Sequence, residues 1–176
     1  MNLESFQTTP GEKKYIRRIL ASLPNGFLSP SSDMPGTREQ RQIGLEAQYK
    51  IAKMFYVPFG EVKIENVDEI DLTIKGMKAD VKCLLADYDP QPYYSVNIKN
   101  YQLQKSKEKD IIIAVMYNRK TETFFIAGWY LINKLKAEWF HYRGEQKIRK
   151  EGSTFQYKAD TWDIPVSEFR PIDQLR

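Results

Sequence analysis

The feature that most constrains the fold is an unbroken apolar run at residues 111–117, Ile-Ile-Ile-Ala-Val-Met-Tyr. Its length matches a single strand, and a run without polar positions is typical of a strand buried on both faces. A sheet that contains such a strand needs a packing layer on each side. This requirement favours an α/β domain, in which helices flank a central sheet.

The spacing of apolar residues elsewhere predicts the order of the other elements. Helical spacing occurs at 15–23, 37–57 and 131–142, and strand character occurs at 61–64, 69–75, 78–85 and 123–130. The polar stretch at 95–105 is typical of a short helix or a loop. We therefore expect a helix, three strands, a short helix or loop, two strands and a helix, arranged as a mixed sheet flanked by helices.

Composition excludes several classes of protein. The 176 residues are 41% hydrophobic and 28% charged, which is enough to bury a core. A single cysteine, Cys83, and a single histidine, His141, exclude a disulfide scaffold and a zinc cluster. No apolar run approaches the ~20 residues of a membrane span, and no secretory signal is visible, so we expect a cytoplasmic protein. The net charge of +4 permits a polyanionic partner without requiring one.

Charged residues interrupt the strands at 69–75 and 78–85. Asp80 and Lys82 are two residues apart, so their side chains share one face of a strand. A two-residue turn at Gly76-Met77 would pair Asp71 with Lys82 and would place Asp71 on that same face. The opposite face would then be apolar throughout. The register, and with it this arrangement, depends on the turn.

Two neighbouring carboxylates repel each other unless a cation neutralises them. Mg²⁺ prefers oxygen ligands and often takes one or two carboxylates together with phosphate oxygens. Lys82 would orient or deprotonate an attacking water, or stabilise the transition state. Glu46, on the rim of the apolar stripe of the helix at 37–57, would reach the same site directly or through water. This set suits metal-assisted phosphodiester hydrolysis.

These residues resemble the PD-(D/E)XK nuclease superfamily over about residues 37–142. The resemblance implies a restriction-endonuclease-like core with the element order α-β-β-β-α-β. It implies catalytic roles for Asp71, Asp80, Lys82 and Glu46, and metal binding by Asp71, Asp80, the Val81 carbonyl and Glu46. One departure is Ile70, which stands where the family has its name-giving proline.

The resemblance also predicts the domain organisation and the activity. Residues 37–142 would form the nuclease-like core, 1–36 an N-terminal helix and loop, and 143–176 a C-terminal extension packed on the core. The expected activity is endonucleolytic hydrolysis of DNA with Mg²⁺, for which Mn²⁺ would substitute. Cutting both strands together would require a homodimer or a higher symmetric oligomer, because each chain carries one site.

Two other interpretations remain open. Asp-Xaa-Lys alone occurs by chance in many proteins, and its charges can form a solvated surface ion pair. The chain would then be a structural or interaction protein. A non-catalytic nucleic-acid-binding module on the same fold is the main alternative. For the tyrosines between Asp87 and Tyr101, packing is the favoured role and base stacking the alternative.

Overall fold

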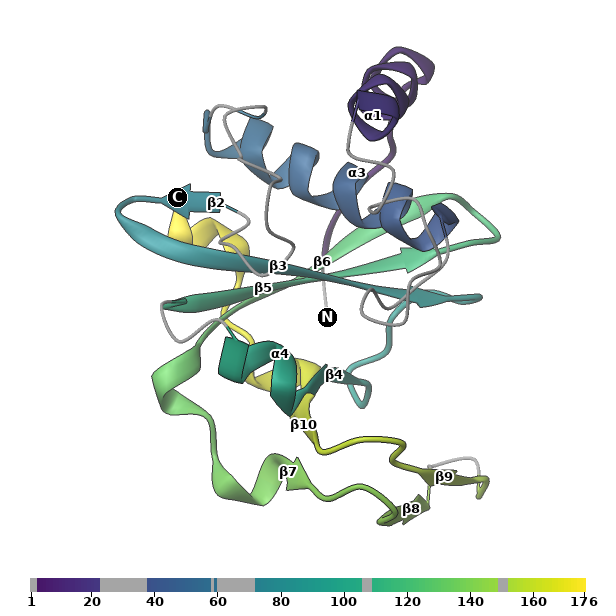
Figure 1. Cartoon of the computed structure of the whole chain (residues 1–176), viewed down its shortest axis with the longest axis vertical. Helices are drawn as coiled ribbons and strands as arrows, with labels where there is room; N and C mark the ends of the chain where they lie inside the picture. The colour runs from purple at the N-terminus through teal and green to yellow at the C-terminus, as the bar shows by residue number, and fades with distance from the viewer. Residues whose placement is uncertain (1–2, 23–37, 58, 60–71, 106–108, 149–151) are drawn as a thin grey trace.

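The computed structural model describes residues 3–22, 38–57, 59, 72–105, 109–148 and 152–176 (Figure 1). Its α-helices are α1 (Pro10–Ser22), α3 (Arg38–Met54) and α4 (Asn100–Lys105). Short 3-10 turns are η1 (Ile132–Lys134), η2 (Ala137–Trp139), η3 (Val166–Glu168) and η4 (Ile172–Leu175). The strands are β1 (Glu4–Phe6), β2 (Leu72–Ile74), β3 (Met77–Ala86), β4 (Ser95–Lys99), β5 (Ile111–Asn118), β6 (Thr123–Leu131), β7 (Phe140–His141), β8 (Gln146–Ile148), β9 (Thr154–Gln156) and β10 (Thr161–Pro165).

A curled, mixed sheet forms the centre of the molecule, with strand order β1-β6-β5-β3-β2. Strands β3 and β5 run parallel, and the other neighbours are antiparallel. All eight residues of β5 are buried, as the apolar run predicts. The expected α/β class, with a mixed sheet and flanking helices, is thus confirmed.

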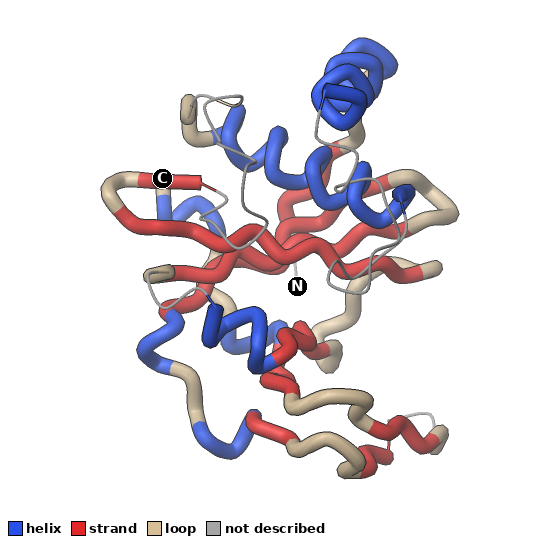
Figure 2. The backbone as a smooth tube through the Cα atoms, viewed as in Figure 1, coloured by secondary structure: helices blue, strands red, loops and turns tan. Residues whose placement is uncertain are grey.

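Different layers cover the two faces of this sheet (Figures 1 and 2). Helix α3 packs on one face, which we call the helix face, and α1 packs on α3. Strands β4 and β10 and helix α4 lie on the other, which we call the second-sheet face. Alternate residues of β5 divide between two separate cores: Ile111, Ile113 and Val115 on the helix face, and Ile112, Ala114 and Met116 on the second-sheet face.

The hairpin of β2 and β3 differs from the predicted register. Residues Lys75 and Gly76 form the turn, both with positive φ (49° and 79°), which is the backbone of a type I′ hairpin. Ile74 therefore pairs with Met77, and Thr73 pairs with Lys78 instead of Asp80. The shift is by two residues, so each described side chain keeps its predicted face. Asp71 and the strand predicted at 61–64 lie outside the described residues.

Two predicted elements are wrong. Residues 95–99 form β4, whose partner β10 lies more than 60 residues further along the chain. The segment 131–142 is not an α-helix but two 3-10 turns followed by β7. Its apolar side chains, among them Leu135 and Trp139, pack on the second-sheet core in this extended path. The short helix expected before β5 is present as α4.

Both ends of the chain contribute to the central layers. Strand β1 is an edge strand of the central sheet, paired with β6. Trp129 in β6 and Arg170 exchange two backbone hydrogen bonds of 2.9 Å, after which Ile172 and Leu175 enter the core of the helix face. In the described part of the chain, no helix is long and apolar enough to cross a membrane.

Candidate functional site

Asp80 is a fully buried carboxylate on the second-sheet face of β3. Its Oδ2 lies 3.0 Å from the Lys82 Nζ, and its Oδ1 lies 3.2 Å from the Lys109 Nζ. The Lys109 side chain is only 6% exposed, whereas that of Lys82 is 24% exposed. Burying an ionised group is costly unless oppositely charged groups accompany it. The two lysines supply that compensation.

The parallel pairing of β3 and β5 positions Lys109. The backbone N–H of Asp110 donates to the Lys78 carbonyl (2.8 Å), and the Lys78 N–H donates to the Asp110 Oδ2 (2.8 Å). These bonds set Lys109 beside Asp80, just before the buried strand begins. The sequence interpretation missed this lysine. The sequence shows that Lys109 comes just before an apolar strand, but it does not show that Asp80 is its neighbour, because that depends on which strands pair.

The described residues contain only part of the predicted metal site. Among them, no group of three or more His, Cys, Asp or Glu residues could hold a metal ion, and Asp71 lies outside them. Asp80 does supply a carboxylate of the kind that hard cations prefer. Val81, between the two charged residues, directs its side chain into the core of the helix face. Of the predicted ligands, the described residues supply the Asp80 carboxylate and the Val81 backbone carbonyl, which are oxygen donors of the type that Mg²⁺ and Mn²⁺ take.

Glu46 lies on α3, on the helix face, and is also buried. Thr8 Oγ1 donates to its Oε2 (2.6 Å), and Gln42 Nε2 donates to its Oε1 (2.9 Å). Burial, with a smaller effect of the Glu46 charge, raises the pKa of the Cys83 thiol to about 12. Cys83 packs against the core of the helix face. The structure therefore brings Asp80, Val81 and Lys82 together, but it places Glu46 across the sheet from the Asp80 carboxylate.

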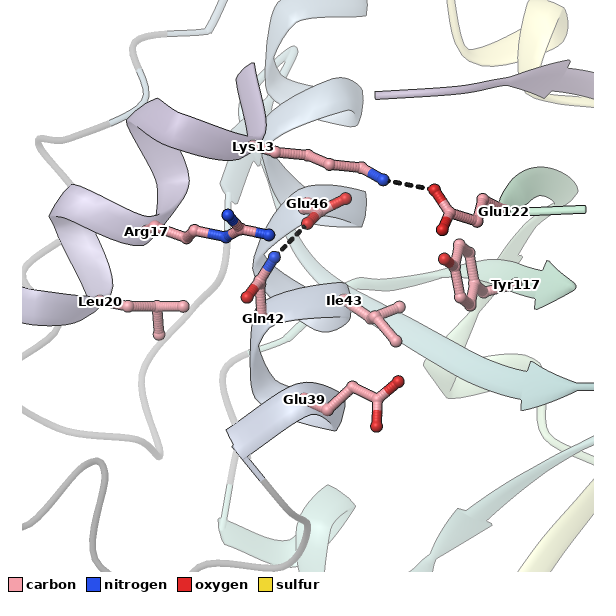
Figure 3. A pocket seen from close by; sticks show the side chains of 9 residues that line it. All are labelled: Lys13, Arg17, Leu20, Glu39, Gln42, Ile43, Glu46, Tyr117 and Glu122. Carbon is pink, nitrogen blue, oxygen red and sulfur yellow. Dashed lines mark hydrogen bonds and ion pairs between the residues drawn. The ribbon is translucent and has the colours of Figure 1, made fainter. Parts of the chain in front are cut away.

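A pocket of about 600 Å³ opens above Glu46, between α1 and α3 (Figure 3). Lys13 of α1 forms an ion pair with Glu122 at 2.5 Å across its mouth. Arg17 extends from α1 toward Glu46 in the same view. Lys13 and Arg17 thus line a pocket with acidic neighbours, and Arg17, like Lys14 and Arg18, is also exposed to solvent.

Comparison with known proteins identifies no relative of this chain. No protein-family model, curated protein or solved structure matches it. Any function must therefore be inferred from the chain's own residues and fold.

Proposed function

We propose that this protein is a metal-dependent nuclease that hydrolyses phosphodiester bonds in DNA. The observation that carries the proposal is the buried Asp80 carboxylate held between Lys82 and Lys109. Buried, closely interacting charged groups are concentrated at functional sites, because they are costly to the fold. Ammonium groups beside a carboxylate suit a site that must accept both a cation and a phosphodiester.

The order of elements supports a restriction-endonuclease-like core. Apart from β4, which belongs to the second sheet, helix α3, strands β2 and β3, helix α4 and strand β5 follow one another in the chain, and β5 is parallel to β3. These are five of the six elements in the order α-β-β-β-α-β, and the strand predicted at 61–64, before β2, would be the sixth. That strand lies outside the described residues.

In this proposal, each residue of the cluster has a distinct task. Asp80, the Val81 carbonyl and Asp71 would hold Mg²⁺ or Mn²⁺, which polarises the phosphate and activates water when bound. Lys82, the more exposed lysine, would contact the attacking water or the phosphate oxygens. Lys109, whose side chain is almost fully buried, would hold the Asp80 carboxylate in place through their ion pair. Glu46 has no direct contact with this cluster, so the proposal gives it no ligand role.

The main alternative is a non-catalytic nucleic-acid-binding module on the same fold. One observation favours it: each Asp80 oxygen already lies within 3.2 Å of an ammonium group. A carboxylate neutralised by two lysines has less need of a metal ion. The lysines alone would then bind phosphate by charge.

Cleavage assays separate these two functions. Supercoiled plasmid and labelled single- and double-stranded oligonucleotides are incubated with Mg²⁺, Mn²⁺ or a chelator. Metal-dependent cutting is expected, with a loss of about 1000-fold in Asp80→Asn and in Lys82→Ala. Lys136→Ala, which removes an exposed lysine paired with Glu168, is the matched control and should cut normally. No cutting by the wild type, with DNA binding retained, would leave the binding module.

The same plasmid assay tests the expected oligomer. A homodimer with two cooperating sites converts supercoiled plasmid directly to linear product, whereas a monomer accumulates nicked circles first. Light scattering of the free protein would give the mass independently.

A further inference from the structure

A second cavity, of about 790 Å³, lies at the far end of β3 from the turn at Lys75. The end of β3 and the loop that follows it form one wall, and the β8–β9 hairpin forms the other. Five aromatic rings line this cavity, which we call the aromatic cleft: Tyr88, Tyr93, Tyr94, Phe155 and Tyr157. Cavities of this size with several aromatic walls typically hold small ligands or parts of larger ones.

Exposed apolar side chains gather at this cleft. Tyr88 is 59% exposed, Tyr93 54% and Ile148 76%. These three are among only seven large hydrophobic side chains that are exposed in the described part of the chain. The Tyr94 ring anchors two of them, with its centroid 5.5 Å from Tyr88 and 5.0 Å from Tyr93. Apolar surface concentrated in this way marks a contact with a ligand.

The floor of the cleft is polar but electrically balanced. The buried Asp163 carboxylate accepts hydrogen bonds from Tyr157 Oη (2.7 Å) and from the Asn97 side chain, and it pairs with Lys147. Burial would raise the pKa of Asp163, but the bonds from Lys147 and Tyr157 outweigh it and leave the pKa below its usual range. Because the Asp163 charge is already neutralised, the floor does not favour a cation. It suits a neutral, planar ligand that exchanges hydrogen bonds.

The cleft and the Asp80 cluster lie on the same face of one strand. Leu84 lines the cleft and faces the second-sheet core, as Asp80 and Lys82 do by strand alternation. Leu84 is four positions beyond Asp80 on the strand, which corresponds to about 13 Å. One strand of DNA carries a phosphate about every 3.4 Å along a duplex, so a few nucleotides cover this distance.

We propose that the aromatic cleft binds an unpaired nucleobase of the nucleic acid that the Asp80 cluster engages. The base stacks on the exposed tyrosine rings, and its edge faces the hydrogen-bonding groups of the floor. This inference deepens the proposed function and rests on it in one respect, namely that the ligand is a nucleic acid. It adds a preference for DNA with unpaired bases a few nucleotides from the bond that is cut.

Binding in a chelator tests the cleft without any cleavage. The probes are a fluorescent oligothymidine of about 12 nucleotides, a strand of equal length with abasic positions, and a duplex of equal length. The wild type should bind oligothymidine at least tenfold more tightly than the abasic strand or the duplex. A Tyr88→Ala/Tyr93→Ala variant should lose roughly 5- to 150-fold in affinity for oligothymidine, since stacking on aromatic rings supplies the preference.

Two further variants keep this test decisive. Tyr88→Phe/Tyr93→Phe retains both rings and should bind like the wild type. Tyr56→Ala removes a tyrosine that is 95% exposed just after α3 and should also leave affinity unchanged. Equal affinity for oligothymidine and the abasic strand would overturn the cleft assignment, as would unchanged binding by the double alanine variant.

The two proposals fail in different ways. If the nuclease proposal is wrong, no metal supports cleavage, yet the preference for unpaired bases remains. If the cleft assignment is wrong, cleavage persists and the alanine and phenylalanine variants bind every probe alike.

Discussion

Asp80 and Glu46 are both buried carboxylates, yet they lie on opposite faces of the central sheet with different partners. Two lysine ammonium groups flank Asp80, while a hydroxyl and an amide donate to Glu46. Both side chains are buried, and Glu46 also lines the pocket between α1 and α3. Neutral donors are sufficient to fix a side chain in place. Paired ammonium groups add a concentration of charge, which is the property that phosphodiester chemistry requires.

The largest expected effect on stability comes from removing Asp80. Asp80→Ala leaves the nearly buried Lys109 ammonium without its partner, so the free energy of unfolding should fall by about 3–5 kcal/mol. Urea denaturation followed by circular dichroism measures this loss. The Asp80→Leu/Lys109→Met double variant should recover most of the stability, because it removes both charges. If Asp80→Ala alone is as stable as the wild type, the ion-paired cluster is wrong.

A substitution at Gly128 should disturb the packing on both faces of the central sheet, because the tail that Gly128 contacts packs on both. Gly128 has φ of +132°, and a Cβ there would lie 2.2 Å from the Arg170 carbonyl oxygen. Gly128→Ala should therefore destabilise the protein by about 2–4 kcal/mol, since the tail beyond Arg170 packs on the helix face and Phe169 packs on the other. Gly144→Ala, at φ +92° with no atom within 4 Å of the added Cβ, is the control and should cost about 1 kcal/mol. Thermal unfolding of both variants checks the difference.

Glu46 should tolerate loss of its charge better than Asp80 does. Glu46→Gln keeps an oxygen that accepts from Thr8, so its free energy of unfolding should fall by about 1 kcal/mol or less. Glu46→Ala removes both hydrogen bonds and should cost about 1–3 kcal/mol. The same urea series gives both values. If the free energy of unfolding falls as much in Glu46→Gln as in Asp80→Ala, the proposed difference between the two carboxylates is wrong.

The smallest effect concerns pH and a third carboxylate, Glu12, which ties α1 to α3. Burial would raise its pKa, but hydrogen bonds from Lys50, the Thr9 backbone and Lys53 lower it to about 2. A lowered folded-state pKa stabilises the protein above the unfolded value of about 4.5, and this contribution disappears as pH falls from about 4.5 to about 2. Lys53 is largely exposed, so we expect a change of about 1 kcal/mol. In Glu12→Gln, the free energy of unfolding should depend less on pH between about 4.5 and about 2 than it does in the wild type. The same pH dependence in both proteins would contradict the lowered pKa of Glu12.

Four of the five strands of the central sheet, β2, β3, β5 and β6, could be predicted from local sequence patterns, whereas the edge strand β1 was not predicted. The apolar run of β5 and the alternation in β2 and β3 identify strands and faces without any knowledge of their partners. Strand β4 was missed although Val96 and Ile98 alternate with polar residues, because it pairs with β10 in the C-terminal tail. A short segment of alternating apolar and polar residues is weak evidence for a strand until the distant strand that pairs with it is known.

The candidate site was predictable only along one strand. Asp80 and Lys82 share a face by the geometry of strands alone, and that prediction is confirmed. The position of Lys109 beside Asp80 depends on the parallel pairing of β3 with β5, which no local sequence pattern specifies. The position of Glu46 on its helix was correct, but the face of the sheet that the helix covers is a property of the whole fold.

The most direct test of the central claim compares cleavage by Asp80→Asn and Glu46→Gln. Single-turnover rates are measured on one labelled DNA substrate with saturating Mg²⁺, after circular dichroism shows that both variants are folded. We predict a loss of about 1000-fold for Asp80→Asn and a change of no more than about threefold for Glu46→Gln. Equal losses would mean that the chemistry spans both faces of the sheet, and an unchanged rate in Asp80→Asn would contradict the proposed active site.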